Sequence, residues 1–165
     1  MVHVIMEGPD KGNRKNKHES RDFEVRFDFV DKVVGFFQND PLVIKILLNR
    51  YEVRQVLMDI GNSVNLLILN VFNKLDLDKN NITRVFYPLV GLRDKIVAVL
   101  STINLPLVLG DERYRREIYA EFAVVDIPFA YNVILGHPIL NCHGVIINMG
   151  AMYLKLLAPR DIAVV

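Results

Sequence analysis

One aspartate is a candidate for chemistry because it ends an apolar, strand-like segment. Residues 56–63 read Val-Leu-Met-Asp-Ile-Gly-Asn-Ser, so Asp59 follows three apolar residues and stands two before Gly61. An ionisable group in such a place is costly unless it is paired or functional. Gly61 lets the backbone turn sharply and lets a second segment approach closely. Asp-x-Gly is also ordinary turn chemistry, and taken alone this motif favours a simple turn.

A later segment changes the interpretation of Asp59. Residues 130–140 read Ala-Tyr-Asn-Val-Ile-Leu-Gly-His-Pro-Ile-Leu, which is an apolar strand that ends at Gly136. A short helix should follow at once, because Pro138 suits the first turn of a helix. Two predicted strands of the chain therefore end near a glycine, Gly61 and Gly136, and the first of them also ends at Asp59.

The elements that must position these residues are mostly short strands. Short β-branched runs separated by turn residues predict strands at 42–48, 51–58, 85–90, 96–103, 106–109, 118–125, 145–148 and 152–157. Helical spacing of apolar residues predicts short helices at 66–75 and 138–142. Many short strands at this spacing predict an all-β barrel or sandwich with one or two short helices.

Composition narrows the classes of protein that fit. With 165 residues and 52% hydrophobic composition, the chain can bury one sizeable core. Its net charge of +1 predicts no general attraction to nucleic acid or to an anionic membrane. The single cysteine, Cys142, excludes an intrachain disulfide and suits a reducing compartment. Because no secretory signal and no membrane-length apolar run occur, we expect an intracellular, cytoplasmic location.

The chain divides by composition into a polar start and an apolar remainder. Residues 8–22 are charged and offer almost nothing to bury, which predicts a flexible linker over 1–38. Alternating apolar residues within it predict a possible strand near 23–30. The folded domain should then cover residues 39–158, with a tail at 159–165.

Together, the Asp59 segment and the strand that ends at Gly136 resemble the retropepsin-like aspartic proteases of plant gypsy-type LTR retrotransposons. In that family an Asp-Ser/Thr-Gly loop is followed by a hydrophobic-hydrophobic-Gly strand, here Ile134, Leu135 and Gly136, which passes beside the loop and leads into a helix. Further matches lie at residues 4–9, 39–43, 88–91 and 105–106. The resemblance implies a single-lobed retropepsin-like barrel from a Gag-Pol polyprotein.

The resemblance also implies an aspartic endopeptidase that hydrolyses a retroelement polyprotein as a homodimer. Bilobal pepsins need a second catalytic Asp-x-Gly, and the sequence has none outside the polar segment at 10–12. One Asp59 from each chain would meet across a twofold axis and share a proton, since two carboxylates about 3 Å apart cannot both ionise. One carboxylate activates water while its protonated partner donates to the scissile carbonyl. This chemistry needs no metal and no cofactor.

Two loops would complete such a site. The active-site loop would consist of Asp59 with Ile60, Gly61, Asn62 and Ser63. The flap that closes over a bound polypeptide aligns with Gly91, Leu92, Arg93, Asp94 and Lys95. An ordinary exposed hairpin turn at 91–95 is an alternative that the residues leave open.

Several residues depart from the family pattern. Ile60 stands where a Ser or Thr hydroxyl normally reaches the partner chain, so each dimer loses two buried hydrogen bonds. Asn62 and Asn65 replace a Ser and an Asp, which predicts a weaker hydrogen-bonding pattern in the loop. Asp94 and Ser101 align with flap glycines. These departures support an alternative function: a catalytically silent dimerisation or peptide-binding module, a decayed remnant that keeps the fold.

A metal site is the remaining candidate. His137, Cys142 and His143 lie close in sequence, but their spacing fits no zinc pattern and a fourth ligand is missing. Cys142 is better interpreted as a small buried residue.

Overall fold

The computed structural model describes residues 40–77, 82–85, 88–90, 96–110, 114–149, 152–157 and 162–165. The expected linker over 1–38, the possible strand near 23–30 and the expected flap at 91–95 lie outside these residues. The described residues form two short helices, α1 (Leu69–Phe72) and α2 (His137–Cys142). The strands are β1 (Val43–Leu48), β2 (Tyr51–Met58), β3 (Leu66–Ile68), β4 (Ile82–Thr83), β5 (Pro88–Val90), β6 (Ile96–Gly110), β7 (Arg115–Val125), β8 (Val133–Leu135), β9 (Ile146–Asn148), β10 (Tyr153–Leu157) and β11 (Ile162–Val164).

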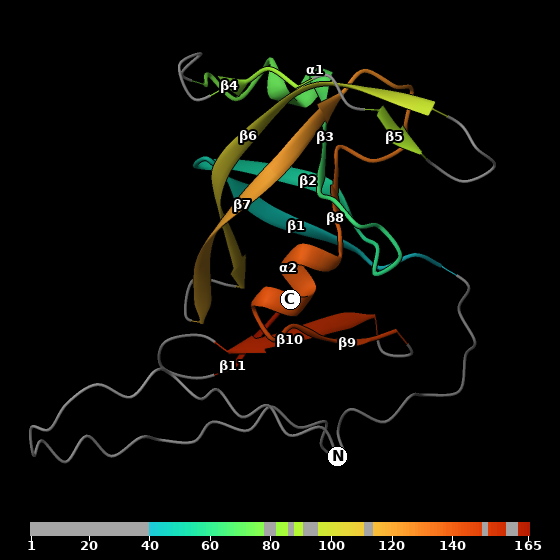
Figure 1. Cartoon of the computed structure of the whole chain (residues 1–165). Coiled ribbons are helices and arrows are strands. Elements are labelled where there is room, and N and C mark those ends of the chain that lie inside the picture. Colours follow the sequence, from blue (N-terminus) through green and yellow to red (C-terminus); the bar gives the residue numbers. More distant parts are fainter. Residues whose placement is uncertain are drawn as a thin grey trace, which may run out of the picture.

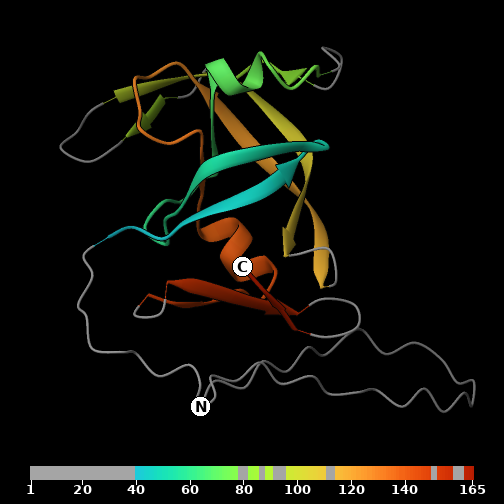
Figure 2. The same ribbon diagram turned by 180° about the vertical axis from the view of Figure 1, so that it is seen from behind.

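The main sheet closes into a barrel. Its strands follow the order β1-β2-β8-β3-β7-β6, and β1 pairs again with β6 to close the circle. Short strands β4 and β5 both attach to β6. A separate three-stranded sheet, β11-β10-β9, lies beyond α2 at one end of the barrel (Figures 1 and 2). The all-β prediction with two short helices is confirmed.

The core follows from the alternation of side chains along the strands. In β1 the residues Ile44, Ile46 and Leu48 are buried and the residues between them are exposed, as expected where one face of a strand lies on a core. The central cluster runs from the barrel into the small sheet, where Leu154 and Leu156 are fully buried. The core therefore joins the two sheets into one packed body.

The predicted helix at 66–75 is wrong at its start. Residues Leu66–Ile68 form β3, which lies between β7 and β8 and pairs with both. Only Leu69–Phe72 are helical. A short apolar run cannot be assigned to strand or helix by spacing alone, and here two neighbouring strands supply the backbone partners of β3.

The two strands predicted at 96–103 and 106–109 are one strand, β6, which continues through Pro106. The carbonyl of Pro106 accepts a hydrogen bond from the Asn49 N–H at 2.9 Å, on the β1 side of β6. The N–H and C=O of a strand residue point to the same edge, so the missing N–H of proline costs no bond between β6 and β7. Ser101, which we aligned with a flap glycine, lies buried within this strand.

Two further strand boundaries differ from the predicted ones. Of the strand predicted at 85–90, only Pro88–Val90 is a strand among the described residues. Strand β11 lies in the segment expected to be a tail: it pairs with β10, and its Ala163 is buried. The folded structure therefore extends past residue 158. Among the described residues, no helix has the length and apolar character needed to cross a membrane.

Candidate active site

Asp59 lies at the end of β2, directly after the buried Met58. Its backbone N–H donates to the carbonyl of Leu135 at 3.0 Å. Its carboxylate oxygen Oδ1 accepts the N–H of Gly61 at 2.9 Å, and its own carbonyl accepts the N–H of Asn62 at 3.2 Å. These bonds fold the chain into a tight loop around a half-buried carboxylate.

Strand β8 passes between the two strands that flank this loop. It runs parallel to β2 and antiparallel to β3, with Leu57 opposite Ile134 and Leu66 also opposite Ile134. The Asp59 loop connects β2 to β3, so β8 crosses under the loop that joins its two neighbours (Figure 1). The structure thus brings the loop together with the strand Ile134, Leu135 and Gly136, two segments far apart in sequence.

Gly136 is the place where the crossing is tightest. A Cβ atom there would lie 2.5 Å from the carbonyl oxygens of both Asn62 and Val64. No side chain fits at that distance from backbone atoms, so the requirement for glycine comes from close approach of two backbones. The sequence motif of an apolar strand ending in glycine has this steric origin.

Three consecutive residues at the end of β8 each bond to the Asp59 loop. The Leu135 carbonyl takes the Asp59 N–H, as described. The Gly136 N–H donates to Oδ1 of Asn65 at 2.9 Å, and the His137 N–H donates to the Asn62 carbonyl at 2.8 Å. The position of Asp59 is therefore set by β8 and by the first turn of α2.

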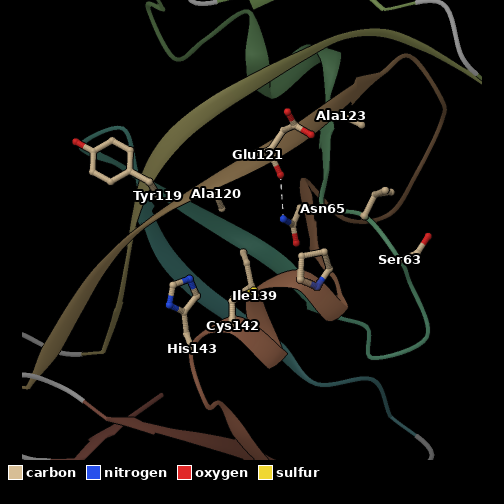
Figure 3. Close-up of a pocket in the computed structure, with 11 residues that line it drawn as sticks. Ser63, Asn65, Tyr119, Ala120, Glu121, Ala123, Ile139, Cys142 and His143 are labelled. Carbon is tan, nitrogen blue, oxygen red and sulfur yellow. Dashed lines mark hydrogen bonds between the residues drawn. The ribbon is translucent and has the colours of Figure 1, made fainter. Parts of the chain in front are cut away.

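Asn65 takes part in the hydrogen bonding of the loop through its side chain and its backbone. That the loop is more weakly bonded than in the resembled family stays a prediction. The Asn65 side chain is buried and makes two hydrogen bonds, one from Gly136 and one to the Glu121 carbonyl at 2.9 Å (Figure 3). Its backbone carbonyl accepts the Ala123 N–H at 2.9 Å. Asn62 is also bonded, because its Oδ1 accepts the Val64 N–H at 3.4 Å.

A second asparagine holds the other end of β8. The register between β1 and β2 shifts by one residue near Gln55, whose φ is +56°. Asn132 donates from its backbone N–H to the Gln55 carbonyl at 2.9 Å and from Nδ2 to the Arg54 carbonyl at 2.8 Å. Bulges of this kind often lie beside functional sites, where they redirect a strand. Here the bulge lies four residues before Asp59.

The loop residues next to Asp59 are open to solvent in a single chain. Ile60 is 68% exposed, and Gly61 and Ser63 are exposed too. The apolar side chain of Ile60 therefore lies in contact with solvent beside the Asp59 carboxylate. The expected flap, Gly91, Leu92, Arg93, Asp94 and Lys95, lies outside the described residues, although the strands before and after it, β5 and β6, pair with each other.

A pocket opens on the other side of this loop, between α2 and the exposed face of β7. It is lined among others by Asn65, Tyr119, Glu121, Cys142 and His143 (Figure 3). Burial lowers the pKa of the His143 imidazole, and the charge of Arg116 lowers it further. The folded chain therefore favours neutral His143, and protonation in acid opposes folding.

The structure does not bring the metal candidates together as a ligand set. Among the described residues, no group of three or more His, Cys, Asp or Glu side chains could hold a metal ion. The Nε2 atom of His137 instead lies 2.5 Å from the Nδ2 atom of Asn141. Cys142 is exposed, so the prediction of a buried cysteine is wrong.

The sequence did not predict the structural role of two asparagines in this region. Asn65 and Asn132 each bond to carbonyl groups in other strands, far away in sequence. The available signal was a polar residue at the edge of an apolar strand, because an asparagine there must find partners for its amide.

Comparisons with known proteins agree with the barrel. No protein-family model matches the chain, and no curated protein matches its sequence. The structure is similar to the retroviral protease-like domain of Ddi1 from Leishmania major, with a TM-score of 0.57, 16% identity, and coverage of 78% of this chain and 96% of that chain. For a retropepsin-like aspartic protease from Rickettsia conorii the TM-score is 0.50 and the identity 20%, with coverage of 74% of this chain and 84% of that chain. For EIAV protease in complex with the inhibitor HBY-793 the TM-score is 0.48 and the identity 23%, with coverage of 70% of this chain and 100% of that chain.

These similarities concern the fold. The first neighbour is matched over nearly its whole length, at an identity too low to carry function with it. The single-lobed retropepsin-like barrel predicted from the sequence is confirmed.

Proposed function

We propose that this chain, which has the retropepsin-like fold, is an aspartic endopeptidase whose active site forms when two copies pair. Each copy contributes one Asp59, and the two carboxylates share a proton across the twofold axis. The ionised carboxylate activates a water molecule, and the protonated one donates to the scissile carbonyl of a bound polypeptide.

The observation that carries this proposal is the placement of Asp59. A half-buried carboxylate lies in a loop at the crossing of β8. The Asp59 N–H donates to the Leu135 carbonyl, and the Gly61 N–H donates to the Asp59 carboxylate. Preorganised geometry of this kind supports catalysis, because small displacements of reacting groups are costly. The exposed Ile60 beside it supports a contact between two loops.

The substrate we propose is a retroelement polyprotein of the plant gypsy type. The support is the resemblance of residues 39–43, 88–91 and 105–106 to that family, in addition to the Asp59 loop. Residues 4–9 add to the resemblance and lie outside the described residues. Homodimer formation and a cytoplasmic setting belong to the same proposal.

The test is peptide cleavage. The chain is incubated with a peptide library at mildly acidic pH, and the products are identified by mass spectrometry. Asp59→Asn keeps the acceptor for the Gly61 N–H and removes the carboxylate, so cleavage should disappear while the fold persists. Asp76→Asn, at an exposed position after α1, is the matched control and should cleave like the wild type. Cleavage that survives Asp59→Asn contradicts the proposal.

One observation favours a second function, a silent dimerisation or peptide-binding module. Ile60 places an apolar side chain where the resembled family has a hydroxyl. In that case the chain binds peptides of the library, for instance in a pull-down, and releases them uncut. The same experiment therefore distinguishes the two functions.

A further inference from the structure

Asn65 occupies a place where few other side chains could serve. It is only 4% exposed, and its amide lies between the Gly136 N–H and the Glu121 carbonyl. Figure 3 shows the side chain extending toward β7, with the dashed bond to Glu121. A buried amide with both ends bonded is stabilising, whereas a buried amide or peptide group left unbonded is costly.

The network fixes the orientation of this amide. The oxygen must face Gly136, which offers a donor, and the nitrogen must face Glu121, which offers an acceptor. A flipped amide would place donor against donor and acceptor against acceptor. The position therefore requires a group that accepts on one side and donates on the other.

The two bonds connect Asp59 to the wall of the barrel. Glu121 belongs to β7, and Gly136 follows Leu135, whose carbonyl holds the Asp59 N–H. Asn65 itself ends the loop that begins at Asp59, and its carbonyl accepts the N–H of Ala123, also in β7. The side chain of Asn65 is thus the link between the Asp59 loop, the end of β8 and the middle of β7.

We propose that Asn65 is a positioning residue for Asp59, and that its amide holds the crossing of β8 against β7 through one accepted and one donated hydrogen bond. The inference rests on the proposed function only where it calls Asp59 catalytic. The hydrogen bonds themselves make a prediction about stability that is independent of catalysis.

Asn65→Asp is the informative variant because it has the same shape. An ionised carboxylate still accepts from Gly136 but presents an oxygen to the Glu121 carbonyl, with no proton between them. A protonated carboxyl donates to Glu121 and restores both bonds. The folded state therefore raises the pKa of the introduced carboxyl above the usual value of about 3.9.

The sign of the pH dependence follows from this. Below about pH 3.9 the introduced carboxyl is protonated in both the folded and unfolded states, so the variant should approach the wild type. As the pH rises above that value, the folding constant of the variant relative to wild type should fall by up to about tenfold per pH unit. The fall stops once the pH passes the raised pKa of the folded state.

The experiment measures denaturant unfolding of the whole chain between pH 3 and pH 8, for wild type, Asn65→Asp and a control. The control is Asn132→Asp at the other end of β8, where the amide donates to a carbonyl at an exposed site. Water can reach that carboxylate, so the relative stability of Asn132→Asp should change little with pH. An Asn65→Asp curve that is parallel to the wild type, or a chain unfolded even at the acid end, overturns the proposal.

Kinetics then separate positioning from mere stability. If the wild type cleaves peptides, kcat per folded Asn65→Asp chain should fall relative to wild type as the pH passes the raised pKa of the folded state, because the folded carboxyl loses its proton there. The change in KM should be smaller. A kcat per folded chain equal to that of wild type overturns the positioning role. If the wild type cleaves nothing, the proposed function fails, while the pH dependence of stability still tests the two hydrogen bonds.

Discussion

At the scale of residues, the side chain next to Asp59 decides what two loops would present to each other. The side chain of Ile60 offers no hydrogen-bond donor or acceptor, and it is 68% exposed in the single chain. In the resembled family a hydroxyl bonds across the dimer. The loop of this chain can instead contribute apolar contact.

Ile60→Thr tests which of these contributions matters. The substitution keeps a β-branched side chain and adds the hydroxyl. If the missing hydroxyl limits the site, two restored bonds at about 0.5–1.5 kcal/mol each should strengthen the dimer by roughly 1–3 kcal/mol in total. Sedimentation equilibrium of the two proteins measures this. A weaker dimer in the variant would show that Ile60 lies in a repacked apolar interface, where a hydroxyl without a partner is costly.

Gly136→Ala tests the backbone crossing. The added Cβ would lie 2.5 Å from two carbonyl oxygens, so we expect a loss of about 1–3 kcal/mol or more in unfolding free energy. Gly144→Ala is the control: its φ of +59° makes alanine cost about 1–2 kcal/mol, but nothing lies within 4 Å of the added atom.

Hydrogen exchange distinguishes the two glycine variants. Only Gly136→Ala should speed exchange of the Asp59 N–H, which is bonded to the neighbouring Leu135. Equal protection of this N–H in both variants would contradict the steric account of the motif.

The sequence predicted those residues of the candidate site whose signal is local. Asp59 and Gly136 each end an apolar run, and an ionisable group or a glycine in that place is visible within a few residues. The hydrogen bonds of Asn65 could not be predicted, because its partners Glu121 and Gly136 are 56 and 71 residues away. In the family motif an Asp stands at the position of Asn65, so the motif indicates a missing carboxylate. In the structure the amide of Asn65 makes two hydrogen bonds.

At the scale of elements, strands with strict alternation were predicted well. In β1, alternate residues are buried, and the predicted strand at 42–48 is confirmed with nearly the same bounds. Elements decided by pairing rather than by pattern were not. β3 is a strand because β7 and β8 lie on its two sides, and β6 continues through Pro106 because the missing N–H points away from β7.

Strand β11 provides a test of where the fold ends. Its Ala163 is fully buried, and Val165 exchanges two backbone hydrogen bonds of 3.0 Å with Leu154. A chain that stops after Leu157 should lose at least about 1 kcal/mol of stability, since these bonds and the buried surface are removed. It should also aggregate more readily, because β10 becomes an open edge.

Removal of residues 1–38 is the matched truncation at the other end. The flexible linker expected over 1–38, which is inferred from the charged residues 8–22, predicts that this change leaves the melting temperature unaltered. A chain without residues 158–165 that melts like the wild type would contradict the role of β11. A strong loss on removal of residues 1–38 would contradict the expected linker.

At the scale of the whole molecule, one chain contains half of the proposed site. The sequence holds a single Asp-x-Gly outside the polar segment at 10–12, and the six strands of the main sheet close into one barrel. A carboxylate that needs a second copy makes activity depend on association. We therefore expect specific activity to fall on dilution through the dimer dissociation range, with rates of second order in protein at the lowest concentrations. A specific activity that is constant over that range contradicts the half-site.

A mixing experiment measures whether two chains share one active site. Wild-type chain is held at one concentration above the dimer dissociation constant, and Asp59→Asn chain is added in increasing excess, with Asp76→Asn in parallel. If each active site takes one Asp59 from each of two chains, mixed dimers are inactive. Cleavage per wild-type chain should then fall in proportion to the wild-type fraction, about tenfold at a ninefold excess of Asp59→Asn. Asp76→Asn should add activity instead. Cleavage that is unaffected by the Asp59→Asn chain would mean that a single chain holds a complete site, and the shared site would then be wrong.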